Sequence, residues 1–264
     1  MENRRYKLSF VLAFLLLISC ALVFGAILRF ELDNKVNYIV YGLVFLMLGI
    51  LAYQSFKEEA YPPSFELKKI NSVADSAFVA GIGFLIDFVN SAATTVSALT
   101  SKRIIFALAG ANAVSLVFAL LSSLYFITVF LSYKYTSYDF RKLRYLHFAP
   151  LLWALAKSGL VILNAVTFRE DVFSSVKGLM LIFAVLFFFS FISEIENKEG
   201  AKKAFVFFLG AFSYLCLLLF LIGIFALRYG KFAPISDNSA FFLTSLCLFF
   251  FAHYFRNNLL SPKI

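Results

Sequence analysis

The sequence is poor in charge and contains no long hydrophilic block. Asp, Glu, Lys and Arg together make up 15% of the 264 residues, whereas a typical soluble domain has roughly 25%. A separate soluble domain is therefore excluded, and we predict one transmembrane domain over residues 1–264. The net charge of +9 does not by itself indicate a nucleic-acid-binding protein, because its meaning depends on where the charges lie along the chain.

The residues and motifs that support most enzyme chemistry are also scarce. The three cysteines, Cys20, Cys216 and Cys247, fall inside apolar runs, without the paired spacing of a disulfide framework or a zinc site. Only two histidines occur, His147 and His253, and the chain has no Walker P-loop, no Rossmann glycine fingerprint and no HExxH motif. We therefore expect no metal, no cofactor and no enzymatic activity.

Apolar residues, in contrast, fill 62% of the positions, and the mean hydropathy is +0.87. A helix that rises about 1.5 Å per residue needs about 20 residues to cross a bilayer core of about 30 Å. Eight runs meet this length, so we predict an all-α, polytopic integral membrane bundle. We attribute the 36 phenylalanines to lipid-facing surfaces and give them no functional meaning. The predicted spans cover approximately residues 8–28, 38–56, 76–99, 104–132, 146–168, 172–193, 204–227 and 240–255.

The distribution of Lys and Arg predicts the orientation of these eight spans. With a cytoplasmic N-terminus, fifteen of the 24 basic residues lie in cytoplasmic segments, seven lie outside, and Lys157 and Lys177 lie within spans. This bias favours both termini in the cytoplasm of a bacterial cell, with the protein in the cytoplasmic membrane. Omitting the third span, which is the least hydrophobic, would place the basic loop 133–145 outside.

The N-terminus allows two interpretations. Basic residues precede Leu17-Ile18-Ser19-Cys20, which fits the lipobox of a lipidated, processed protein. The chain after Cys20 stays apolar, however, and the whole run has the length of a span. We therefore favour an uncleaved first span.

The third span contains a carboxylate, Asp87, in the sequence FLIDFVNSAATT of residues 84–95. A carboxylate at the bilayer centre costs about 2.5–3.5 kcal/mol on insertion scales, so it requires a partner, a proton or water. Helical spacing places Asn90, Ser91 and Thr94 on the same face as Asp87. This polar stripe has two interpretations: a tight packing interface between helices, or part of a binding site.

A partner for Asp87 is predicted in the fifth span. Counted from the cytoplasmic ends of their spans, Lys157 and Asp87 both lie near the membrane midplane. Opposite charges at equal depth are expected to meet or to share water. The pair would then either fix helix packing or take part in ion or solute binding. Alternatively, Trp153 could cover the Lys157 ammonium through a cation–π contact.

Polar residues on neighbouring spans extend this hypothesis. Asn112 lies in the fourth span and Asn164 in the fifth. We therefore predict a transporter or permease with a solute or ion site between spans three, four and five. The alternative is a non-transporting scaffold or accessory subunit that binds a protein partner in an envelope or signalling complex. The candidate site comprises Asp87, Lys157, Asn90, Ser91, Thr94, Asn112 and Asn164.

The basic loop YKYTSYDFRKLRY, residues 133–145, interleaves cations with aromatic residues. Such interleaving can bind nucleic acid, but a short loop between two spans lies at the lipid headgroups, where each basic residue contributes about 1 kcal/mol of attraction. We therefore expect contacts with the bilayer and its anionic headgroups and none with nucleic acid. The predicted contact residues are Lys134, Arg141, Lys142 and Arg144.

One segment supports the architecture by resemblance. In HFAPLLWALAKSGL, residues Pro150, Trp153 and Lys157 follow the spacing P-x-x-W-x-x-x-K. This segment resembles a span of uncharacterised multi-spanning bacterial membrane proteins. The resemblance covers this span and the one that follows. It implies a multi-spanning fold and no particular activity.

Overall fold

The computed structural model describes residues 35–57, 71–100, 106–135, 139–167, 172–196 and 201–228, together with Ile18, Ser19, Leu22 and Leu243. Within these residues all regular structure is helical. The elements are α2 (Lys35–Lys57), α3 (Asn71–Thr100), α4 (Phe106–Tyr135), η1 (Phe140–Lys142), η2 (Arg144–His147), α5 (Phe148–Thr167), α6 (Val172–Ile195) and α7 (Ala201–Arg228).

Five helical segments in the described residues are long and apolar enough to cross a membrane. They are Val73–Ser97, Ala109–Tyr135, Arg144–Leu163, Val176–Ile195 and Lys203–Ile222, and a shorter apolar segment, Tyr41–Tyr53, lies within α2. The predicted third to seventh spans fall on α3 to α7. The predicted spans 8–28 and 240–255 lie almost wholly outside the described residues, as do both termini, so the count of eight and the cytoplasmic termini stay predictions.

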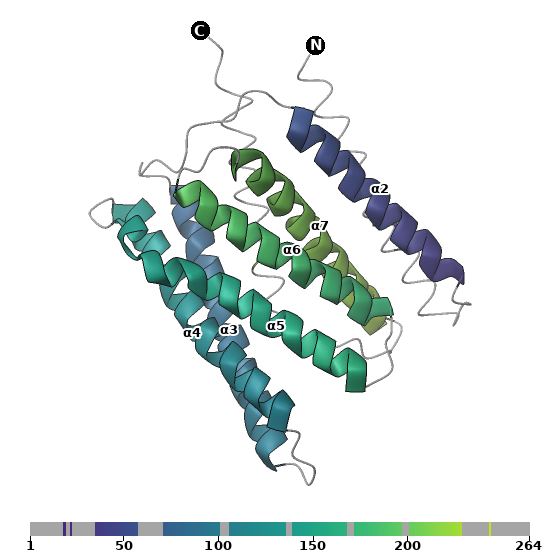
Figure 1. Ribbon diagram of the computed structural model, residues 1–264, viewed down its shortest axis with the longest axis horizontal. Helices are drawn as coiled ribbons and strands as arrows, with labels where there is room; N and C mark the ends of the chain where they lie inside the picture. Colours follow the sequence, from purple (N-terminus) through teal and green to yellow (C-terminus); the bar gives the residue numbers. More distant parts are fainter. Residues whose placement is uncertain are drawn as a thin grey trace.

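The helices lie in a row, each packed against the next along the chain from α3 to α7, and α2 packs against α7 (Figure 1). Long helices joined by short connections run in opposite directions and pack side by side. This explains why neighbours in the sequence are neighbours in the row. The loop that carries η1 and η2 joins α4 to α5 at one end of the bundle, taken along the helix axes. We call this end the loop end and the opposite end of the helices the far end.

Helices α3 and α4 form the closest pair of the row. The hydroxyl of Ser123 donates a hydrogen bond of 2.8 Å to the carbonyl oxygen of Gly81, and both residues are buried. A Cβ atom at Gly81 would lie 3.3 Å from Cγ1 of Ile127 and 3.4 Å from the backbone oxygen of Ser123. The absent side chain of Gly81 therefore lets the two backbones approach, as small residues do between membrane helices.

Phenylalanines form much of the core between α6 and α7. Phe187 stacks on Phe205 and Phe212, with ring centroids 5.7 and 5.6 Å apart, and all three rings are buried. Phe45 and Phe189, in contrast, are more than half exposed. The prediction that the phenylalanines face lipid is therefore wrong for this cluster. An aromatic ring contributes packing area and favourable ring geometry inside a bundle as well as at its surface.

Candidate functional site

The carboxylate in α3 and the ammonium in α5 form an ion pair inside the bundle. The Nζ atom of Lys157 lies 2.9 Å from Oδ1 of Asp87, and the Asp87 side chain is 3% exposed. Lys157 also donates a hydrogen bond of 3.2 Å to the hydroxyl of Ser91. The sequence-based hypothesis that the two charges meet agrees with this geometry.

Trp153 binds the same carboxylate. Its indole Nε1 donates a hydrogen bond of 2.7 Å to Oδ2 of Asp87, so each carboxylate oxygen accepts a hydrogen bond from α5. The alternative in which Trp153 covers the ammonium in place of Asp87 is therefore wrong, because Lys157 pairs with Asp87 and the indole N–H donates to the same carboxylate. The rings of Trp153 and Phe84 of α3 pack edge to face, with their centroids 4.9 Å apart.

The periodicity of α3 explains why Asp87 points into the bundle. The buried residues Val73, Ala77, Ala80 and Phe84 precede Asp87 at steps of three or four, and Ser91 continues the stripe. This spacing keeps the side chains on one face of a helix. Asp87 thus lies on the core face of α3, near the middle of the segment Val73–Ser97.

The spacing in α5 explains why two donors reach one carboxylate. Trp153 and Lys157 are four residues apart, which places them on one face of the helix a turn apart. Both side chains are long, so they bridge α5 to α3 even though the closest backbone packing of each helix is with α4. An ion pair buried in this way requires satisfied hydrogen bonds to offset desolvation, and Trp153 and Ser91 supply them.

Lys157 is the more accessible member of the pair. Its side chain is 19% exposed, compared with 3% for Asp87. An ammonium has three N–H donors, and two of them bind Asp87 and Ser91. In the described part of the chain no further acceptor binds Lys157. One donor is therefore left for an acceptor from outside this set.

A buried hydroxyl in α4 lies at the height of the ion pair. Gly81 lies against both Ser123 and Ile127. Because α3 and α4 are antiparallel, counting from these two contacts brings Ser115 level with about residues 89–93 of α3, around Ser91. Ser115 is fully buried, and its hydroxyl has no hydrogen-bond partner among the described residues. Such a group is unusual in a packed interior.

The other predicted site residues differ in their placement. Asn90 and Asn112 are half-buried, and neither forms a hydrogen bond with the ion pair among the described residues. Thr94 is exposed, and its hydroxyl donates to the Ser91 carbonyl oxygen at 3.0 Å within α3. Asn164 belongs to α5, and its side chain lies outside the described set. Among the candidates whose side chains the structure describes, only Ser91 is shown to bind one of the two charges.

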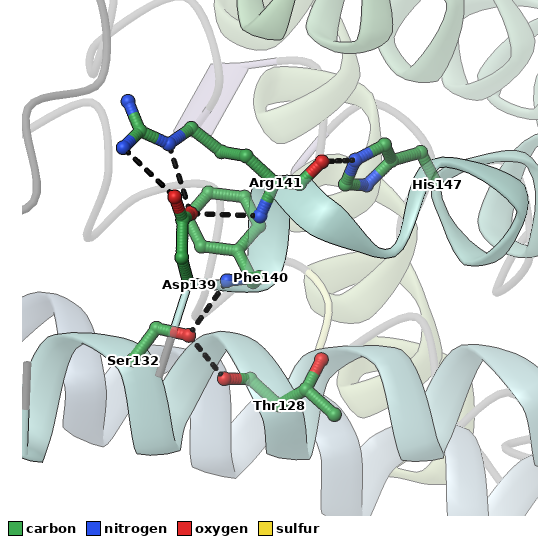
Figure 2. A network of polar contacts seen from close by, with 6 residues as sticks. All are labelled: Thr128, Ser132, Asp139, Phe140, Arg141 and His147. Carbon is green, nitrogen blue, oxygen red and sulfur yellow. Dashed lines mark hydrogen bonds and ion pairs between the residues drawn. The ribbon is translucent and has the colours of Figure 1, made fainter. Parts of the chain in front are cut away.

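The loop between α4 and α5 is held by its own network of hydrogen bonds (Figure 2). The backbone N–H of Phe140 donates to the Ser132 hydroxyl at 3.1 Å, which fastens the loop to α4. Asp139 caps η1 by accepting from the Arg141 backbone N–H at 3.0 Å. Nε2 of His147 lies 3.4 Å from the carbonyl oxygen of Arg141. The first of these bonds connects the loop to α4, and the other two hold the loop's own segments η1 and η2 in place.

The Asp139 carboxylate also binds the guanidinium of Arg141 through two atoms. Nε and Nη2 of Arg141 lie 2.9 and 3.0 Å from Oδ1 and Oδ2 of Asp139. The hydrogen bond from the Arg141 side chain is the main reason that the pKa of Asp139 lies below its usual value. This bidentate geometry is the strong form of a carboxylate–guanidinium pair.

The four predicted headgroup cations also have different surroundings. Arg141 is engaged by Asp139, and Lys134 is half-buried in the last turn of α4. Lys142 and Arg144 are exposed and line a surface hollow of about 410 Å³. Contact with headgroups stays a prediction for all four residues.

Two features of the site escaped prediction from the sequence. From the sequence, Trp153 is an alternative partner of Lys157 and not a donor to Asp87, although the four-residue spacing places Trp153 and Lys157 on one face of α5. The orphan hydroxyl of Ser115 is not among the predicted site residues. Neither its burial nor its lack of a partner leaves a signal in the sequence.

Comparisons with known proteins add no family assignment. No known family model, no curated protein and no solved structure matches this chain.

Proposed function

We propose that this protein transports a small solute or ion across a membrane, with Asp87 and Lys157 as the charged elements of the binding site. The observation that carries the proposal is the buried ion pair near the middle of an apolar helix. Ionisable residues at this depth are expensive and are by default functional candidates. The multiple apolar helices support the coarser statement that this is a membrane protein.

The third donor of Lys157 indicates the chemistry of the solute. A group that binds there must accept a hydrogen bond, as a carboxylate, a phosphate or a carbonyl does. The buried hydroxyl of Ser115, at the same height, supplies a second polar group near this level of the bundle. Both groups are available without breaking a hydrogen bond between described residues.

Charge balance in the site links the binding of an anionic solute to the protonation of Asp87. The ion pair is neutral, and an anion bound at Lys157 would leave one uncompensated negative charge in a poorly hydrated site. A proton that binds Asp87 together with the anion restores neutrality. We therefore propose proton coupling through Asp87, in which protonation weakens its hold on Lys157 and favours solute binding.

Access from the far end fits the burial of α3. On the loop side of Asp87 the same face of α3 is fully packed and leaves no exposed path to the carboxylate. Its residues there are Phe84, Ala80 and Ala77, each 0% exposed. On the other side Thr94 and Val96 are exposed, and α5 diverges from the α3–α4 pair away from the loop (Figure 1). We propose that solute reaches Lys157 from the far end.

Cysteine accessibility tests this proposal. In a background that lacks Cys20, Cys216 and Cys247, we expect Ser91→Cys and Thr94→Cys to react with a membrane-impermeant thiol reagent applied from one side. Ala80→Cys, on the same stripe but toward the loop, is the matched control and should stay unreactive. Unreactive cysteines at both 91 and 94 would contradict a water-filled path and favour the scaffold or accessory-subunit role.

A further inference from the structure

The hollow at the loop end combines two cations with exposed apolar side chains. Lys142, Leu143, Arg144, Tyr145, Leu146, Phe148 and Glu196 line its volume of about 410 Å³. Tyr145 is 93% exposed and Phe148 is 43% exposed. This mixture differs from the ion-pair site in α3 and α5, and the proposed transport does not use it.

We propose that this hollow binds the phosphodiester headgroup of an anionic phospholipid. Lys142 and Arg144 contribute two positive charges and Glu196 one negative charge, so the lining carries a net charge of +1, which complements the single negative charge of a phosphodiester. Arginine is well suited to two phosphate oxygens because its N–H donors lie in a fixed fork. Lysine adds a second, more mobile donor group.

The loop presents these cations from a fixed backbone. The bond between Phe140 and Ser132 fastens one end of the loop to α4 (Figure 2). The Phe140 ring is buried against Tyr133 and His147. Arg141 is bound to Asp139 and does not line the hollow, so we do not count it as a third phosphate ligand. A site with a preordered backbone loses less conformational entropy on binding.

The apolar rim favours a lipid over free phosphate. Tyr145 of η2 and Phe148, the first residue of α5, lie beside the cations. Both belong to the apolar segment Arg144–Leu163. Aromatic side chains with one apolar and one polar side are typical of the membrane interface. An acyl chain next to the bound headgroup would cover this rim, which inorganic phosphate leaves exposed.

Binding of lipids to the purified full chain tests the proposal. We would measure retention of phosphatidylglycerol and phosphatidylcholine by native mass spectrometry, and thermal stabilisation of the detergent-solubilised protein by each lipid. The wild type should prefer phosphatidylglycerol. In Lys142→Gln/Arg144→Gln its affinity should fall about 25-fold, because each basic residue at a membrane surface contributes about 1 kcal/mol and each 1.4 kcal/mol is a tenfold change.

A matched variant separates the hollow from general surface charge. Lys134→Gln/Lys203→Gln removes the same charge from the last turn of α4 and the first turns of α7, and neither residue lines the hollow. This control should lose clearly less affinity for phosphatidylglycerol than Lys142→Gln/Arg144→Gln does. An equal loss in both double variants, or equal binding of phosphatidylcholine by the wild type, would overturn the proposal.

Inorganic phosphate distinguishes the two sources of the anion. If inorganic phosphate alone stabilises the wild type but not Lys142→Gln/Arg144→Gln, and phosphatidylglycerol has no such effect, the hollow binds free phosphate and the lipid assignment is wrong. Unfolding temperatures of all variants without added lipid establish that each is folded. Because the transport hypothesis concerns Asp87 and Lys157, its failure would leave this result unchanged.

Discussion

Trp153 and Lys157 lie one turn apart on α5 and bind different oxygens of the same carboxylate, Asp87 of α3. The two donors therefore act together, and the carboxylate has a hydrogen bond on each oxygen. A lone carboxylate in this position would be strongly destabilising. The arrangement turns an unfavourable group into a fixed connection between two helices whose backbones are not in extensive contact.

The ion pair predicts strong coupling between its two members. We expect Asp87→Asn and Lys157→Met each to destabilise the protein by about 3–5 kcal/mol, because each leaves a buried charge without its partner. The double variant should lose clearly less than the sum of the two single losses. Unfolding in detergent, together with folded yield, measures this cycle. Additive losses would contradict a direct interaction.

Trp153 predicts a smaller effect that depends on Asp87. Trp153→Phe keeps an aromatic ring beside Phe84 but removes the N–H donor to Oδ2. We expect a loss of about 1.5–3 kcal/mol, the usual contribution of a hydrogen bond to a charged group. The same substitution in an Asp87→Asn background should cost less. An equal cost in both backgrounds would assign the effect to packing alone.

We predict that adding one methyl group at Gly81, in the α3–α4 interface, lowers the stability of the protein. Gly81→Ala brings a Cβ against Ile127 and the Ser123 backbone, and overpacking of this kind costs about 1–3 kcal/mol. Gly110→Ala in α4 is the control, because a Cβ there meets nothing within 4 Å and alanine favours helix by about 1 kcal/mol. Unfolding measurements should therefore rank Gly110→Ala above Gly81→Ala in stability.

We predict that the Tyr125 hydroxyl can be removed without loss of stability. Its side chain is fully buried, and its hydroxyl has no partner among the described residues. Tyr125→Phe should therefore be neutral or stabilising. Ser123→Ala in the same helix removes the bond to Gly81 and should cost about 1 kcal/mol. Marked destabilisation by Tyr125→Phe would reveal an additional partner for the hydroxyl.

We predict that Asp139 contributes to the stability of the folded loop and that acid removes this contribution. Because Arg141 lowers the folded-state pKa of Asp139, the unfolded chain takes up its proton first as the pH falls. The contribution is complete above the ordinary value of 3.8 and is lost as the pH falls through the lower folded-state pKa. Hydrogen exchange of the amides in η1 should show this loss. In Asp139→Asn and Arg141→Gln the acid-dependent change should be smaller.

Much of the bundle could be predicted from the sequence because hydrophobic length and helical period are local properties. Long apolar runs placed the five helices that could span a membrane, since about 20 such residues are needed to cross it. Counting along the third and fifth spans placed Asp87 and Lys157 at equal depth. That they touch follows from the same physics, because opposite charges in a poor solvent attract strongly.

Only the tertiary structure decided which neighbours the other polar residues meet. Asn90 and Thr94 belong to the same sequence pattern as Ser91, yet only Ser91 binds Lys157, because the rotation of α3 against α5 is set by packing along their whole lengths. The same holds for Trp153, whose donor is directed at the carboxylate, and for Arg141, which Asp139 engages at the loop. The order of residues along one helix determines the depth of each side chain and the face of the helix on which it lies. The partner of each side chain depends on how separate helices are rotated and packed against one another.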